Sequence, residues 1–126
     1  MNPQRHMQFK HAMVKVRDFE LKFKAVGDDW CSTNRTPAGK RISYKPGTKP
    51  KAPDWDGGGA ECGGGLHFSP SPHHALEFNP EATRFVGCPV LVSEIVVHPN
   101  GVYPSKVKAP RVYGKCFEVD LDGNPK

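Results

Sequence analysis

The sequence predicts one α+β domain that is compact and mostly antiparallel β, with one or two short helices. Three observations predict this class. The chain has 126 residues, the usual length of a single domain. Its 13 glycines and 13 prolines punctuate almost every stretch, which argues against long helices. Its apolar residues recur at every second position or in short runs rich in valine and isoleucine, as strands require. We expect about five strands within residues 1–126, with residues 1–13 as a flexible N-terminal arm.

The first strand is predicted within residues 14–26. Phe19, Leu21 and Phe23 alternate with charged residues, which is typical of a strand with one buried face. Gly27-Asp28-Asp29 then ends the strand as a turn. The polar, basic stretch from residue 30 to residue 53 predicts a long connection, with one short strand candidate at residues 41–44.

A short strand and a short helix are predicted next. Leu66-His67-Phe68-Ser69 has the composition of a strand. Ser71 is a suitable N-cap and Pro72 suits the first helical position, so we expect a helix over residues 72–78. Asn79-Pro80 would end it. The apolar stripe of this helix consists of Ala75, Leu76 and Phe78.

Two apolar stretches predict the remaining strands. Residues 85–98 are the most hydrophobic part of the chain, which favours a central strand that ends at Pro99. Residues 107–120 predict a last strand or hairpin, broken at Pro110 and Gly114.

The net charge of +5 is unevenly distributed. Residues 1–53 hold twelve Lys and Arg against four Asp and Glu, whereas residues 54–126 hold six against nine. Such a basic half indicates either a solvated rim or weak, non-specific contact with nucleic acid. The lysines and arginine that would make such contacts are Lys40, Arg41, Lys45, Lys49 and Lys51.

No apolar run approaches the ~18–20 residues of a membrane span, and residues 1–9 lack the apolar region of a secretory signal. We therefore expect a cytoplasmic protein with no membrane partner. The four cysteines are predicted to be reduced, small, buried residues. A zinc site is the alternative, although its donors match no spacing motif and we expect no metal. Those donors would come from Cys62, His67, His73, His74, Cys88 and His98.

The glycine-rich segment 54–65 holds six of the thirteen glycines. It lacks the lysine and hydroxyl residue of a phosphate-binding P-loop, and it does not open a long helix as a dinucleotide-binding turn does. A surface loop is the simpler interpretation.

Residues 63–99 resemble the middle of the ADP-ribosyltransferase fold in poly(ADP-ribose) polymerases. The shared order is a glycine turn, a short strand, a proline-started helix that ends in an aromatic residue, and an apolar strand. His67 stands where that family has a tyrosine, and Phe78 follows eleven residues later, where the family stacks an aromatic ring on nicotinamide. Ser71 and His73 lie between them. The resemblance implies that these four residues bind the nicotinamide end of NAD.

The same resemblance implies two catalytic carboxylates. Glu94 lies in Leu91–Val97, which is similar to the family's L-x-G-E-V-A-L strand, and Glu118 would stand for the late catalytic glutamate. The chain reads Phe23-Lys24-Ala25-Val26-Gly27 where the family has its first His-Gly strand. This departure favours a protein that binds NAD and has lost the transfer reaction.

The whole chain also resembles small proteins of actinobacterial bacteriophages, over about residues 20–122. The shared motifs are CGGGLHFSPSPHHALEF, RFVGCPV, EIVVHP and KVKAPRV. This resemblance implies a phage protein that acts inside the host cell. Taken together, the two resemblances predict an accessory protein in the host cytoplasm that binds a nucleotide or a host factor. The alternative is a non-enzymatic interaction or virion protein that uses its glycine-rich loop and basic half as contact surface.

Overall fold

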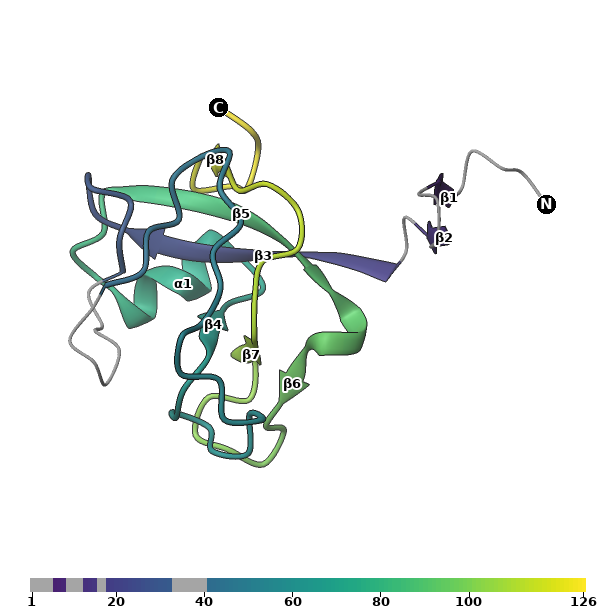
Figure 1. Cartoon of the computed structure of the whole chain (residues 1–126). Coiled ribbons are helices and arrows are strands. Elements are labelled where there is room, and N and C mark those ends of the chain that lie inside the picture. The colour runs from purple at the N-terminus through teal and green to yellow at the C-terminus, as the bar shows by residue number, and fades with distance from the viewer. Residues whose placement is uncertain (1–5, 9–12, 16–17, 33–40) are drawn as a thin grey trace.

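The computed structural model describes residues 6–8, 13–15, 18–32 and 41–126. Most of the predicted N-terminal arm and Lys40 lie outside these residues. In this part of the chain, eight strands form three antiparallel sheets, with one short α-helix, so the predicted mostly antiparallel α+β class is confirmed (Figure 1). In chain order the elements are β1 (His6–Gln8), β2 (Met13–Lys15), β3 (Phe19–Val26), β4 (Leu66–Phe68), α1 (Pro72–Phe78), β5 (Arg84–Leu91), the 3-10 helix η3 (Val92–Glu94), β6 (Val96–Val97), β7 (Val107–Ala109) and β8 (Phe117–Val119).

The main sheet has the order β3-β5-β8, and a second sheet has the order β4-β7-β6. β3 and β5 pair along their whole length, from Phe19 opposite Leu91 to Val26 opposite Arg84. The backbone of Phe23 joins the two sheets, because its N–H and C=O both bond to Ser69, at 2.9 and 3.0 Å. This junction sets β4 beside the C-terminal half of β3. The β1–β2 pair forms the third sheet.

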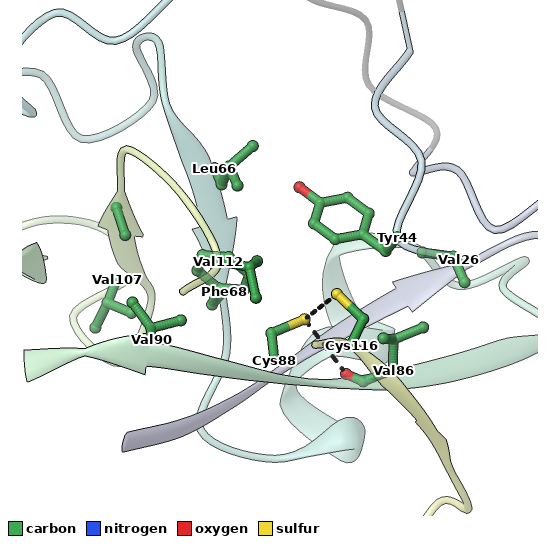
Figure 2. Packing of buried hydrophobic residues seen from close by; sticks show 11 residues of the cluster. Val26, Tyr44, Leu66, Phe68, Val86, Cys88, Val90, Val107, Val112 and Cys116 are labelled. Atoms are coloured by element: carbon green, nitrogen blue, oxygen red, sulfur yellow. Dashed lines mark hydrogen bonds between the residues drawn. The ribbon is translucent and has the colours of Figure 1, made fainter. Parts of the chain in front are cut away.

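The hydrophobic core fills the space between the two larger sheets (Figure 2). Tyr44 from the connection lies against Phe68 of β4 in an edge-to-face contact, with ring centroids 6.3 Å apart. Cys88 and Cys116 meet in this core with their sulfur atoms 4.0 Å apart. The buried side chains of the cluster are Val26, Tyr44, Leu66, Phe68, Val86, Cys88, Val90, Val107, Ala109, Val112 and Cys116.

Strand β3 is confirmed, but the prediction that one of its faces is buried and the other exposed is wrong. Leu21 on the predicted buried face is 40% exposed, whereas Lys22 on the charged face is only 8% exposed. Lys22 is buried because the face of the main sheet that carries it is covered as well. Helix α1 packs over Phe23 and Ala25 on one side, while the second sheet covers the other. Lysines of β3 therefore project toward the interior.

Helix α1 begins and ends as predicted. The Ser71 hydroxyl accepts a hydrogen bond from the backbone N–H of His74 at 3.2 Å, and Pro72 occupies the first helical position. The N–H of Asn79 bonds to the Leu76 carbonyl as the helix ends. The predicted apolar stripe is only partly buried, because Phe78 is 37% exposed.

Three predicted strands need correction. The strand expected over residues 85–98 divides at η3 into β5 and β6, which belong to different sheets. Valine and isoleucine favour both strands equally, so the composition does not mark the turn between them. β7 and β8 also lie in different sheets and form no hairpin. In the described part of residues 30–53, the candidate at 41–44 contributes a single bridge, Cys31 to Ser43.

All four cysteines are free thiols, as predicted, but not all are buried. Cys88 and Cys116 lie in the core, Cys31 is half-buried and Cys62 is exposed. Cys62 is exposed because it lies in the glycine-rich loop, outside both sheets. Within the described residues, no helix is long and apolar enough to cross a bilayer.

Candidate functional site

A cleft of about 460 Å³ opens beside β4, between the end of helix α1, the glycine-rich loop and the loop before β7. A narrow extension of about 60 Å³ continues toward β3 and the buried Ala75 of the helix. We call this space the cleft. It is lined by Lys24, Ser32, Ile42, Tyr44, Asp54, Cys62, Gly63, Gly65, Leu66, His67, Phe78, Tyr103 and Lys106.

Lys24 brings a positive charge to the wall of the cleft. Lys24 lies on the face of β3 opposite helix α1, beside Val26 of the core. Its Nζ donates to the backbone carbonyl of His67 at 2.7 Å and lies 5.5 Å from the centre of the Tyr44 ring. Burial lowers the pKa of Lys24 to about 8. The ammonium group is therefore largely charged at neutral pH and is poorly hydrated.

Lys106 brings a second charge, which lies beside two aromatic rings. Its Nζ lies 5.7 Å from the centre of the Phe78 ring and 5.5 Å from that of Tyr103. These two rings contact each other edge-to-face, with centroids 4.9 Å apart. Lys106 is only 6% exposed and its Nζ also donates to the Cys62 sulfur at 3.4 Å. Cation–π contacts thus replace part of the hydration that this ammonium loses.

Glu61 fixes the segment that carries Tyr103. Its carboxylate accepts hydrogen bonds from the backbone N–H groups of Val102 at 3.0 Å and Tyr103 at 2.9 Å. These bonds lower the pKa of Glu61, and the bond from Tyr103 has the largest effect. The glycine-rich loop and the loop before β7 are therefore joined at the mouth of the cleft.

His67 lies at the centre of β4 and lines both the cleft and its extension. Its Nε2 is 2.9 Å from the carbonyl oxygen of Gly63. Because a carbonyl only accepts, Nε2 carries the proton and Nδ1 is left as an acceptor. The pKa of His67 is lowered to about 4, mainly because the ring is buried and also because lysines lie nearby. The hydrogen bond to Gly63 raises this pKa, but by less than burial lowers it. His67 is therefore neutral at physiological pH.

This pKa predicts a pH dependence of stability. Between about pH 4 and 6.5 the unfolded chain holds a proton on His67 that the folded chain does not, so stability should rise with pH across this window. The slope is at most about 1.4 kcal/mol per pH unit for one proton. In His67→Gln the slope between pH 5 and 6.5 should disappear, as measured by urea unfolding at fixed pH values.

The window from pH 5 to 6.5 separates His67 from the carboxylates, which titrate lower. His73→Gln is the matched control, since His73 is exposed on helix α1. If the slope of stability against pH is unchanged in His67→Gln, or is lost equally in the control, then His67 does not cause the pH dependence.

The glycine-rich loop is held by its own aspartates and by a buried lysine. Asp56 accepts from the N–H groups of Gly58 at 2.9 Å and Gly64 at 3.2 Å, and Asp54 accepts from Gly65 at 3.1 Å. Lys108, which is fully buried, donates to the carbonyl of residue 60 at 2.7 Å. These N–H groups are already bonded, so they do not form a phosphate cradle.

The structure brings two of the predicted NAD-binding residues together and sets the others apart. His67 and Phe78 line one cleft. Ser71 caps helix α1 and its hydroxyl lies 2.6 Å from Nδ1 of His74. His73 is exposed on the helix and, like Ser71, does not line the described part of the cleft.

Both predicted catalytic carboxylates form ion pairs outside the cleft. Glu94 lies in η3, not in a strand as expected, and binds the guanidinium of Arg111 through three contacts of 3.0–3.2 Å. Glu118 lies on β8 and pairs with Arg84 at 3.2 Å and Lys126 at 3.7 Å. Neither is among the residues that line the cleft in the described structure.

Lys24, Lys106 and Tyr103 line the cleft but were not among the predicted site residues. Lysines usually lie at the surface, so a sequence pattern assigns the lysines of a strand to its exposed face. A signal was nonetheless present in Lys106-Val107-Lys108-Ala109, where lysines alternate with small apolar residues and all four are buried.

Comparison with known protein families, with curated protein sequences and with solved structures finds no match to this chain. The residues weighed for zinc do not converge either. Among the described residues, no group of three or more His, Cys, Asp or Glu is placed to hold a metal ion. The geometry of the cleft is therefore the basis on which a function can be argued.

Proposed function

We propose that the cleft binds a nucleotide, with NAD as the first candidate, and that it does so as an ADP-ribosyltransferase-like pocket without the transfer reaction. One observation carries this proposal. Lys24 and Lys106 present two poorly hydrated ammonium groups to the same space as the rings of Phe78 and Tyr103.

Unpaired buried ammonium groups favour an anionic ligand. Within the described structure, neither Lys24 nor Lys106 has a carboxylate within 4.0 Å, and their partners are a carbonyl, a thiol and aromatic rings. Burying a charge without a counterion costs free energy. A phosphate group in the cleft would recover part of this cost through charge-assisted hydrogen bonds. Asp54 is the one carboxylate in the described lining, and it already binds the N–H of Gly65.

Exposed rings at the mouth favour a ligand with a flat group. Phe78 and Tyr103 are both exposed, although they are large and aromatic. A nicotinamide or adenine ring could cover them and remove apolar surface from water. The cleft volume lies within the range of about 300–1,000 Å³ that is usual for small-molecule sites.

The positions of Glu94 and Glu118 support binding rather than transfer. An ADP-ribosyl transfer needs a carboxylate at the ribose or the acceptor. Both of these glutamates are instead neutralised by arginine outside the cleft. The phage resemblance supports the wider proposal of an accessory protein that acts in the host cell.

A thermal-shift panel tests this proposal. We expect NAD and AMP to raise the melting temperature, since a ligand at 100 times its dissociation constant adds about 2.7 kcal/mol to stability. Adenosine and nicotinamide, which lack phosphate, should give smaller shifts, and so should inorganic phosphate, which lacks a ring.

The comparison between AMP and adenosine is the control within this panel, because the two share the ring and sugar. Equal shifts for both would mean that the lysines do not recognise a phosphate. No shift with either NAD or AMP at millimolar concentration would refute nucleotide binding.

A further inference from the structure

A second depression, of about 650 Å³, lies at the other end of β3. The depression is separate from the cleft. Phe19 lines the depression and Lys24 lines the cleft, and five residues of β3, or about 16 Å, separate them. We call the depression the basic groove. It is lined by Phe19, Lys49, Lys51, Pro89, Arg111, Val112, Tyr113, Gly114 and Lys115.

Backbone pairing holds the lysines of the basic groove in place. The N–H of Ala52 bonds to the Pro110 carbonyl at 2.8 Å, and the N–H of Val112 bonds to the Pro50 carbonyl at 2.9 Å. Lys51 consequently lies opposite Arg111 in an antiparallel bridge. In such an extended segment Lys49 and Lys51 project to the same side, because side chains alternate.

Two aromatic rings also line the basic groove. Phe19 and Tyr113 lie with their centroids 5.2 Å apart and their planes at 47°. The guanidinium of Arg111 lies 5.0 Å from the centre of the Tyr113 ring. Glu94 binds this guanidinium through both carboxylate oxygens and so positions it against the ring. The Glu94–Arg111 pair therefore holds the guanidinium against the Tyr113 ring and stabilises the position of that ring.

The remaining charges of the basic groove lack acidic partners. Lys49, Lys51 and Lys115 are exposed, and none forms an ion pair with another described residue. The lining contains no carboxylate within the described chain. Three free ammonium groups around half-buried rings make a surface suited to an anionic chain that carries flat groups.

We propose that the basic groove binds single-stranded nucleic acid. Tyr113 and Phe19 would stack on unpaired bases, and the three lysines would contact the flanking phosphates. In a duplex the bases are already stacked and their faces cannot reach such rings, so a single strand fits better. An acidic peptide would satisfy the lysines but would leave the rings uncovered.

Fluorescence anisotropy with a labelled ten-nucleotide oligothymidylate tests this proposal on the full chain. We expect binding at low salt whose affinity falls with salt, with a slope of log K against log salt concentration near −2 for three phosphate contacts. Tyr113→Ala should weaken binding by about 5- to 100-fold, the usual effect of removing one stacking ring. Lys49→Ala/Lys51→Ala should weaken binding and reduce the slope by about 1.4.

Two matched variants serve as controls. Leu121→Ala removes an exposed apolar side chain, and Lys45→Ala removes an exposed lysine; neither residue lines the basic groove. Both should bind oligothymidylate like the wild type. Circular dichroism should confirm that the Tyr113→Ala protein is folded, and Tyr113→Phe, which keeps the ring, should restore binding.

Three results would overturn the proposal. One is the absence of binding at low salt. Another is an equal loss in the groove variants and in the control variants. The third is binding of a labelled oligoglutamate as tight as that of oligothymidylate and unaffected by Tyr113→Ala, which would identify an acidic peptide as the partner. None of these results bears on NAD binding in the cleft.

Discussion

Replacing Phe68 by alanine is expected to lower the free energy of unfolding by about 3–5 kcal/mol. Phe68 is 1% exposed and lies at the point where β4, the Tyr44 ring and the space between the two sheets meet. Its removal leaves a cavity that rigid strands on both sides cannot fill, so the loss includes the missing contacts as well as the hydrophobic transfer. Urea unfolding monitored by circular dichroism measures the change.

Phe78→Ala is the matched control for this prediction. The same side-chain atoms are removed, but Phe78 is 37% exposed at the mouth of the cleft. We expect a loss of no more than about 1.5 kcal/mol, because a partly exposed ring contributes less on burial. Equal losses in the two variants would contradict the assignment of Phe68 to the core and of Phe78 to the cleft.

Lys24→Met is expected to weaken NAD binding by about 10- to 100-fold while leaving the stability of the free protein unchanged or increased. The loss reflects a missing charge-assisted hydrogen bond, which is typically worth about 1.5–3 kcal/mol. Stability should not fall, because burial disfavours this ammonium and lowers its pKa, whereas the methionine side chain is apolar and of similar length. Such a combination is typical of a residue retained for binding.

Lys22→Met is the control on the same strand and the same face. Lys22 is also buried, but its Nζ forms an ion pair with Glu20 at 2.7 Å and it does not line the cleft. NAD affinity should be unchanged in this variant. If both variants lose NAD binding to the same extent, the loss results from a general change in strand β3 and not from the missing charge of Lys24.

Local signals in the sequence were sufficient for several elements. Ser71, Pro72 and Asn79 placed both ends of helix α1, because each acts on the backbone immediately next to it. The alternation of Phe19, Leu21 and Phe23 with charged residues likewise indicated β3, and Gly27 marked its end, although the strand begins at Phe19 and not at residue 14. Capping and alternation depend on neighbours in the chain, so no knowledge of the tertiary structure was needed.

Other features of the fold depend on tertiary packing and could not be predicted from the sequence pattern. The alternation in β3 does not say that both faces are covered, so the burial of Lys22 and the exposure of Leu21 were not predictable. The apolar run 85–98 likewise contains no residue that marks the change of sheet at η3. In the candidate site, His67 and Phe78 followed from a local motif, but Lys106 reaches them only through the pairing of β4 with β7.

The most direct test of nucleotide binding in the cleft is calorimetric titration of NAD into the wild-type and Lys24→Met proteins at pH 7 and pH 9. The diphosphate of NAD keeps its charge over this range, whereas Lys24, with a pKa of about 8, loses its proton. An anion prefers the protonated lysine, so wild-type affinity should fall above pH 8, by up to about tenfold per pH unit. Lys24→Met should bind weakly at both pH values and show no such fall. Failure of the wild type to bind NAD at pH 7, or an equal fall in both proteins, would contradict the account.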